Sequence, residues 1–258
     1  MNFIHKHPMD VNVNTVMRWH EIKQNIKNIN FKDIDVLDVG SGLGFFSLKF
    51  KELGANVLAI DIDKNSLDYL ESRYKIKTSN VNVENGIDIN KKFDLIFIGE
   101  ILEHIKDPSS LLKNISQMLS NSGQLIVTTP ALEGWLTDSK GKKMCHEDGH
   151  EKHLRDGFSM GDLLSIGRDA GLQIVWKENA IFTFAELFMQ LTKLFYKRKK
   201  KAYASQHDII NLMNTVSYKA LFLLFTIVRK IFAIESFFSK MLGIKGHCHI
   251  ICFKNVDR

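Results

Sequence analysis

The sequence predicts a doubly wound α/β fold, in which the strands of a mostly parallel sheet alternate with helices. The first observation is an apolar run, 35–39, that ends in a glycine-rich turn at 40–44. An amphipathic segment, 45–53, follows the turn, so this stretch is typical of a strand, a tight turn and a helix. Two further apolar runs, 56–61 and 93–100, follow with helical patterns after each of them. This alternation is typical of β-α-β units.

Length and composition indicate one ordinary globular core with an appendage. The chain has 258 residues, of which 45% are apolar and 25% are charged. Much of the net charge of +6 lies in the basic run 197–201, so the charge indicates a local basic patch. Nucleic acid is therefore not the expected partner of the whole domain.

The sequence shows no pattern typical of a membrane span or of a signal peptide. The longest apolar run, 220–228, is shorter than the ~20 residues of a membrane span, and residues 1–10 lack the apolar stretch of a signal peptide. Three widely spaced cysteines do not suggest a disulfide framework. We therefore expect a cytoplasmic protein, and the few prolines with abundant Lys, Asn and Ile suggest a bacterial source.

The other elements are expected in the following order. A helix over 11–29 belongs to an N-terminal arm, 1–30, whose first ten residues are expected to be loose. The later elements of the core, 31–179, are a strand at 56–60, a helix at 66–73 capped by Asn65, strands at 76–83 and 94–98, a helix at 108–119, a turn at 121–123, a strand at 124–129, a long polar loop at 131–155, a helix at 159–170 and a strand at 172–176.

The last part of the chain departs from simple alternation. Residues 180–243 carry two apolar segments with helical periodicity, separated by the basic run. Residues 247–253 alternate in polarity and predict the last strand, within a final segment 244–258. We interpret 180–243 as a helical insertion into a single domain that comprises 1–258.

The glycine turn differs from the usual dinucleotide fingerprint. A third glycine of G-x-G-x-x-G would fall at Phe45, whereas the chain has G-x-G-x-G after Asp38. This pattern resembles motif I of class I S-adenosylmethionine-dependent methyltransferases, and 93–100 resembles their fourth strand. The resemblance implies the Rossmann-like methyltransferase fold, a seven-stranded sheet whose last strand is antiparallel.

The resemblance also implies S-adenosylmethionine as cofactor. Asp38 would meet its methionine amino group, the turn would approach it by backbone, and Asp61 would bind both ribose hydroxyls. Asn82 stands where the family usually has Asp beside the adenine, with Glu84 as its rival. The complete set of implied contacts is Asp38, Gly40, Ser41, Gly42, Gly44, Phe45, Asp61, Ile62, Asn82, Val83 and Glu100.

The candidate catalytic residues follow the fourth strand, in Glu100-Ile101-Leu102-Glu103-His104. If this stretch forms one helical turn, Glu100, Glu103 and His104 share a face. In one interpretation His104 is a general base for a substrate hydroxyl. In another the three side chains hold a divalent metal, Mg or Zn. In a third they only shape the pocket floor.

The E-x-x-E-H string is similar to that of ubiquinone-biosynthesis O-methyltransferases and of small-RNA 2′-O-methyltransferases. The latter bind a metal with it and add a downstream histidine. His153 in the long polar loop is the preferred fourth ligand or substrate contact. A zinc site built on Cys145 and nearby histidines is disfavoured because the chain has no paired cysteines.

The insertion 180–243 indicates the kind of partner. Apolar residues between 221 and 232 form a wide face with Arg229 and Lys230 nearby, and the basic run precedes them. Such a segment suits peripheral contact with an anionic membrane at its inner face, or a lipid tail. The alternative is a lid packed on the core. RNA is disfavoured because aromatic residues are not interleaved with the basic run.

We therefore expect methylation of an oxygen on a small or lipid-linked acceptor, such as a quinone precursor, a glycan or a secondary metabolite. The alternatives are a metal-dependent RNA 2′-O-methyltransferase and a non-catalytic, cofactor-binding regulatory subunit. The intact set of Glu100, Glu103, His104 and His153 argues against the regulatory subunit.

Overall fold

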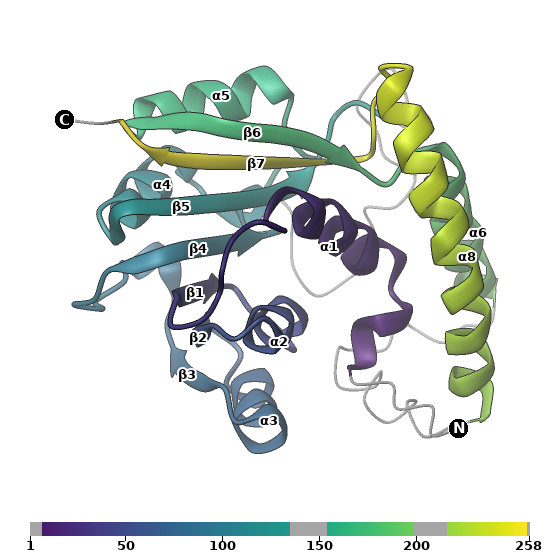
Figure 1. Cartoon of the computed structure of the whole chain (residues 1–258), viewed down its shortest axis with the longest axis horizontal. Coiled ribbons are helices and arrows are strands. Elements are labelled where there is room, and N and C mark those ends of the chain that lie inside the picture. The colour runs from purple at the N-terminus through teal and green to yellow at the C-terminus, as the bar shows by residue number, and fades with distance from the viewer. Residues whose placement is uncertain (1–6, 135–153, 199–215, 257–258) are drawn as a thin grey trace. The chain divides into compact units, whose positions relative to one another are not determined.

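A seven-stranded sheet in the order β3-β2-β1-β4-β5-β7-β6 organises the fold (Figure 1). The structure, a computed structural model, describes residues 7–134, 154–198 and 216–256. The chain divides into two units. We call the first, residues 27–132, 151–178 and 249–258, the sheet unit, and the second, residues 1–26, 133–150 and 179–248, the helical unit.

The strands lie within or close to the predicted ranges. They are β1 (Asp35–Val39), β2 (Asn56–Asp61), β3 (Lys77–Asn80), β4 (Phe93–Gly99), β5 (Leu119–Pro130), β6 (Leu172–Ala180) and β7 (Cys248–Asn255). Strands β3, β2, β1, β4 and β5 pair in parallel. Just beyond the end of β7, Val256 N donates to the oxygen of Gly171, just before the start of β6. Strand β7 therefore runs opposite to β6, which confirms the predicted mixed sheet.

The helices of the sheet unit lie between the strands in sequence. They are α2 (Phe45–Glu52), α3 (Lys64–Tyr74), α4 (Pro108–Ser116) and α5 (Met160–Asp169), with 3-10 turns η2 (Val83–Asn85) and η3 (Leu102–His104). The predicted cap of α3 was wrong. Asp63, not Asn65, is the cap, because Asp63 keeps an extended backbone and its Oδ1 accepts from Asn65 N at 3.1 Å.

The predicted turn at 121–123 lies inside β5 instead. Strand β5 pairs with β4 at Phe93↔Leu119 and again at Leu95↔Gln124, so extra residues bulge between the two pairs. Gly123 permits this bulge, since a Cβ there would lie 2.8 Å from the carbonyl oxygen of Phe93. The predicted turn was therefore wrong, because the strand continues through these polar residues.

Side chains of β4 alternate between the two faces of the sheet. Phe97 stacks on Phe46 and Phe50 of α2, with ring centroids 4.3 and 5.9 Å away. Its neighbours Ile96 and Ile98 belong to the core cluster that also contains side chains of α4 and α5. Helices on both faces bury the sheet, which is why its central strands are apolar at almost every position.

The helical unit contains η1 (Pro8–Val11), α1 (Val13–Asn25), α6 (Thr183–Arg198) and α8 (Val216–Met241). The expectation that residues 1–10 are loose was wrong for the part that the structure describes. His7 is buried and caps η1, since Met9 N donates to its Nδ1 and its own N donates to Asp10 Oδ2. No helix within the described ranges has the length and apolar character that a membrane crossing needs.

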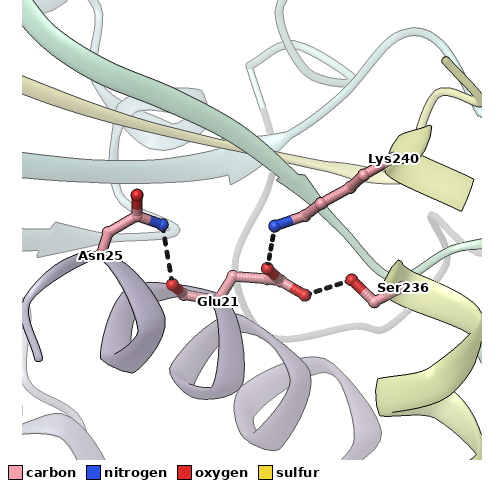
Figure 2. Close-up of polar contacts among 4 residues, drawn as sticks. All are labelled: Glu21, Asn25, Ser236 and Lys240. Carbon is pink, nitrogen blue, oxygen red and sulfur yellow. Dashed lines mark hydrogen bonds and ion pairs between the residues drawn. The ribbon is translucent and has the colours of Figure 1, made fainter. Parts of the chain in front are cut away.

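A buried carboxylate ties α1 to α8 (Figure 2). Glu21 is 1% exposed, and its two oxygens accept from Ser236 Oγ and Lys240 Nζ. Its backbone oxygen accepts from Asn25 Nδ2 at 3.0 Å. A charged group so far from water requires such partners, because an isolated buried carboxylate is strongly disfavoured.

Replacing this carboxylate tests its role in stability. Glu21→Gln keeps the volume but removes the negative charge that Lys240 faces, and Lys240 is only partly exposed. We expect a loss of about 1–3 kcal/mol in the free energy of unfolding, measured with urea. The control is Glu133→Gln, whose ion pair with Lys245 is exposed. That change should cost less than about 1 kcal/mol, and an equal loss in both variants would contradict this account.

Candidate functional site

The glycine turn lies at the carboxyl ends of β1 and β2 in the sheet unit. Gly40, Gly42 and Gly44 have φ angles of +68°, +50° and +74°, a region that disfavours other residues. A Cβ on Gly40 would lie 2.1 Å from Ile101 Cδ1, and one on Gly44 would lie 2.1 Å from Leu70 Cδ2. A side chain at either position would have to displace Ile101 or Leu70, and the backbone angle favours glycine at both.

Hydrogen bonds from β2 hold the turn in place. Gly40 N and Ser41 N both donate to the carbonyl oxygen of Ile60, at 2.8 and 3.1 Å. The half-buried carboxylate of Asp61 then accepts from Gly42 N at 2.7 Å and from Asp63 N at 2.8 Å. Each carboxylate oxygen has room for a second donor. Asp61 can therefore hold the turn and still accept hydrogen bonds from a ligand.

Asp38 lies at the end of β1, directly before the turn, and is 1% exposed. Burial raises its pKa to about 7, partly offset by hydrogen bonds from Ser47 and increased slightly by Asp61. Ser47 Oγ donates to Asp38 Oδ2 at 2.5 Å. A carboxyl group that titrates near neutrality beside a glycine turn is suited to pair with a cationic ligand.

Three neighbours of the turn have different environments. The Ser41 hydroxyl is buried and makes no hydrogen bond within the part of the chain that the structure describes. Ile62 is 64% exposed just after β2, where it offers an apolar surface. Phe45 is buried against Phe46, with ring centroids 5.3 Å apart. Its side chain thus belongs to the core, although its backbone begins α2.

The expected adenine contacts surround η2. Asn82 caps this turn, and its Oδ1 accepts from Glu84 N at 3.0 Å. Asn82 and Val83 are half-buried, whereas Glu84 is exposed and accepts from Lys106 N at 3.3 Å. A cavity of about 310 Å³ lies beside them, lined by residues of η2 and of the start of α4. Val83 and Glu84 line this cavity, and Asn82 precedes them as the cap of η2.

Glu100, Glu103 and His104 do not share one helical face. Glu100 directly follows β4 with φ at +57°, outside any helix, and only 102–104 form the 3-10 turn η3. Glu103 is buried and accepts from Thr129 Oγ1 at 3.4 Å, while His104 is half-buried. The three side chains would share a face only in a continuous helical turn, and the left-handed backbone angle of Glu100 interrupts that turn.

Arg155 binds the backbone of η3 and of the residues that follow it. Its Nη1 donates to the carbonyl oxygens of Leu102 and Ile105, at 2.8 and 2.7 Å, and its Nη2 donates to that of Lys106 at 3.3 Å. The adjacent Leu154 N donates to the carbonyl oxygen of Glu103 at 3.1 Å. The planar guanidinium thereby gives the Leu102 carbonyl a second donor besides Ile105 N, and it also supplies donors to the carbonyls of Ile105 and Lys106.

The described members of the predicted metal site do not come together as ligands. Among the described residues no three side chains of His, Cys, Asp or Glu come together as metal ligands. Glu100, Glu103 and His104 therefore do not make a three-ligand site, with Glu103 turned toward Thr129. His153 and Cys145 lie outside the described residues, as do His146 and His150.

Sequence reasoning missed two residues that shape the site. Ser47 lies in the first turn of the helix after the glycines, and its hydroxyl donates to the carboxylate of Asp38. That position in the sequence is the signal that could have identified it. Ile101 contacts the position of the absent Cβ of Gly40, and no sequence pattern predicts that approach. The contacts of Arg155 with the carbonyls of 102, 105 and 106 join distant parts of the chain, so no local pattern predicts them.

Comparisons with known proteins agree with this geometry. A family model described as a methyltransferase domain matches residues 14–177. A ubiquinone biosynthesis O-methyltransferase of Coxiella burnetii is 32% identical over 108 residues, 40% of this chain and 46% of that protein. The chain thus matches less than half the length of this curated relative.

Solved structures share the fold. An S-adenosylmethionine-dependent methyltransferase from Mesorhizobium loti has a TM-score of 0.54 at 18% identity, covering 74% of this chain and 96% of its own. The [4+2]-cyclase SpnF has a TM-score of 0.60 at 15% identity, covering 95% of this chain and 83% of its own. At these identities the likeness shows the fold, and a cyclase among the neighbours shows that the fold alone does not fix the reaction.

The raised pKa of Asp38 predicts how stability depends on pH. The unfolded chain releases this proton near pH 3.8, whereas the folded chain keeps it until about pH 7. Stability from this group is therefore full below about pH 4 and is lost as the pH rises through about 7. Asp38→Asn should remove that loss and be about 2–4 kcal/mol more stable than the wild type at pH 8.

Urea unfolding of both proteins from pH 4 to pH 8 measures this difference. Asp94→Asn is the control, because Asp94 lies at the amino end of β4 and accepts from Asp35 N and Ser120 Oγ. Parallel pH profiles for Asp38→Asn and the wild type would contradict the assignment.

The Arg155 contacts predict a local effect on η3. Arg155→Lys keeps the charge but loses the planar fork, so we expect amide exchange at His104 and Ile105 to become roughly tenfold faster. Hydrogen exchange with residue resolution measures this, and Arg168→Lys on the exposed side of α5 is the control. Unchanged exchange at η3 in Arg155→Lys would show that the guanidinium does not hold the segment.

Proposed function

Because the chain belongs to the family of methyltransferase domains, we propose that it transfers a methyl group from S-adenosylmethionine to an oxygen of a small or lipid-linked acceptor. The observation that carries the proposal is a pair of carboxylates, Asp38 and Asp61, at the carboxyl ends of adjacent parallel strands. Between them lies the glycine turn, with Gly40, Gly42 and Gly44 at positive φ. Open α/β sheets bind their ligands at this edge.

Each carboxylate has a distinct role toward the cofactor. Asp61 accepts hydrogen bonds from the ribose hydroxyls with the lone pairs that Gly42 N and Asp63 N leave unused. Asp38 faces the ammonium group of the methionine moiety, and a cation there favours its ionised form. The Ser41 hydroxyl, buried without a partner among the described residues, gains one from the ligand.

The adenine end is assigned to the segment around η2. The exposed side chain of Ile62 covers one face of the ring. Asn82 accepts from the exocyclic amino group through the second lone pair of Oδ1, and Val83 N donates to the ring. Asn82 does this without a charge, so its replacement by Asp should be tolerated.

The acceptor is proposed to react through oxygen. The matched ubiquinone biosynthesis enzymes are named O-methyltransferases, and the E-x-x-E-H string supports the same kind of acceptor here. S-adenosylmethionine supplies a methyl group that is already electrophilic. The protein then needs to align a hydroxyl and accept its proton as the O–C bond forms.

His104 is the proposed general base. A neutral imidazole accepts a proton through its unprotonated ring nitrogen. It is half-buried on η3, the turn that Arg155 fixes by three carbonyl contacts. Glu103, buried next to it in sequence, anchors the turn through Thr129. Acceptors with a phenolic or sugar hydroxyl, such as a quinone precursor, a glycan or a secondary metabolite, suit this chemistry.

Calorimetric titration of S-adenosylmethionine tests the cofactor assignment. Asp61→Asn removes the ionised acceptor, and we expect at least about tenfold weaker binding, since hydrogen bonds to a charged group contribute about 1.5–3 kcal/mol. Affinity in the wild type should rise with pH through about 7, as Asp38 ionises. The matched control is Asp94→Asn, which loses similar backbone and hydroxyl contacts at the other end of the sheet.

Equal affinity for the wild type and Asp61→Asn would contradict the assignment. Binding without transfer of a labelled methyl group to any hydroxyl acceptor would instead favour the non-catalytic subunit. His104→Asn separates these outcomes for an identified acceptor, because it should reduce kcat while leaving the affinity for S-adenosylmethionine unchanged.

A further inference from the structure

The outward face of α8 is apolar along its whole described length. Six large side chains spaced three or four residues apart are each at least half exposed. They are Leu223, Ile227, Ile231, Ile234, Phe238 and Met241. We call them the α8 stripe. With a rise of 1.5 Å per residue the α8 stripe is about 27 Å long.

The opposite side of α8 already forms the core of the helical unit. Phe225 and Phe232 are buried there, and Phe232 contacts Phe188 of α6 with ring centroids 5.6 Å apart. A surface helix normally turns a polar face outward. Helix α8 is apolar on both sides, so the α8 stripe is not explained by packing within the unit.

The charges around the α8 stripe have one sign. Lys230 lies three residues after Ile227 and four before Ile234, which places it on the same face. Lys219 lies four residues before Leu223 at the start of the stripe, and both lysines are exposed. The acidic residue of α8, Glu235, accepts hydrogen bonds from Phe184 N and Ala185 N and so caps α6. The exposed stripe therefore carries positive charge only.

Helix α6 and the end of α8 extend the apolar surface. The two helices lie side by side within the helical unit (Figure 1). Phe184 and Leu191 of α6 are more than half exposed, and Leu242 follows the end of α8 with 69% exposure. An apolar surface of this extent marks an interaction site.

We propose that the α8 stripe docks on the surface of an anionic phospholipid bilayer, with α8 lying in the plane of the interface. The apolar side chains would enter the acyl boundary, while Lys219 and Lys230 reach back to lipid phosphates. This arrangement needs a long apolar stripe with basic residues on or beside it and no free acid, which is the composition that α8 has. The proposal does not depend on the reaction proposed above.

A second copy of the chain fits the charges less well. In a twofold contact the same patch meets itself, so the lysines of the two copies would approach one another. Glu235 of α8 does not offset this repulsion, because it accepts hydrogen bonds from the first residues of α6. Lipid phosphates, in contrast, neutralise both lysines without any change in the fold.

Vesicle sedimentation of the full chain tests the proposal. The wild type should bind vesicles of phosphatidylcholine with phosphatidylglycerol, bind neutral phosphatidylcholine vesicles more weakly, and lose affinity at high salt. Lys219→Gln with Lys230→Gln should weaken binding to the anionic vesicles about fivefold per lysine. Ile227→Ser with Ile234→Ser should weaken it at least about tenfold on both kinds of vesicle.

Matched controls lie on β6 of the sheet unit. Ile174→Ser and Lys177→Gln change exposed residues of the same types away from the α8 stripe and should bind vesicles like the wild type. Circular dichroism of every variant verifies folding. Failure of the folded wild type to bind anionic vesicles would overturn the proposal, and so would equal binding by the stripe variants. A concentration-dependent dimer that Ile227→Ser with Ile234→Ser dissociates would assign the stripe to a second copy instead.

Discussion

The contact between Asp61 and Gly42 N is the constraint on which the candidate site depends. A turn of three glycines with left-handed backbone angles has little stiffness of its own, because glycine loses more conformational freedom on folding than any other residue. The end of β2 supplies the stiffness, through the Ile60 carbonyl and the Asp61 carboxylate. The same carboxylate then remains available to a ligand, so preorganisation and recognition share one side chain.

Burial of Asp38 follows from the same geometry. Its carboxyl group is buried at the end of β1 beside Ser47. The resulting rise of its pKa to about 7 makes the folded chain less stable when that group ionises. A cationic ligand offsets this cost, because it favours the charged form. Backbone strain also gathers at this edge of the sheet, where the three glycines and Glu100 have positive φ angles. Such strain is typical of binding sites.

Much of this could be predicted from the sequence, because strand, turn and helix signals are local. The runs that form β1, β2 and β4, the glycine turn, and Gly171 after α5 all act within a few residues. What could not be predicted depends on contacts between distant residues. The grip of Arg155 on η3, the approach of Ile101 to Gly40 and the bulge of β5 opposite Phe93 are of this kind. The expected common face of Glu100 and His104 failed because a single left-handed residue at a strand end leaves no trace in spacing.

The central claim is that the edge formed by β1 and β2 is the cofactor site, and hydrogen exchange with and without saturating S-adenosylmethionine tests it most directly. The account predicts slower exchange at the amides of 40–44 and of Val83, with the amino ends of the strands, near Asp35 and Asp94, unchanged. Protection that falls elsewhere, or none at saturation, would contradict it and leave the glycine turn without an assigned ligand.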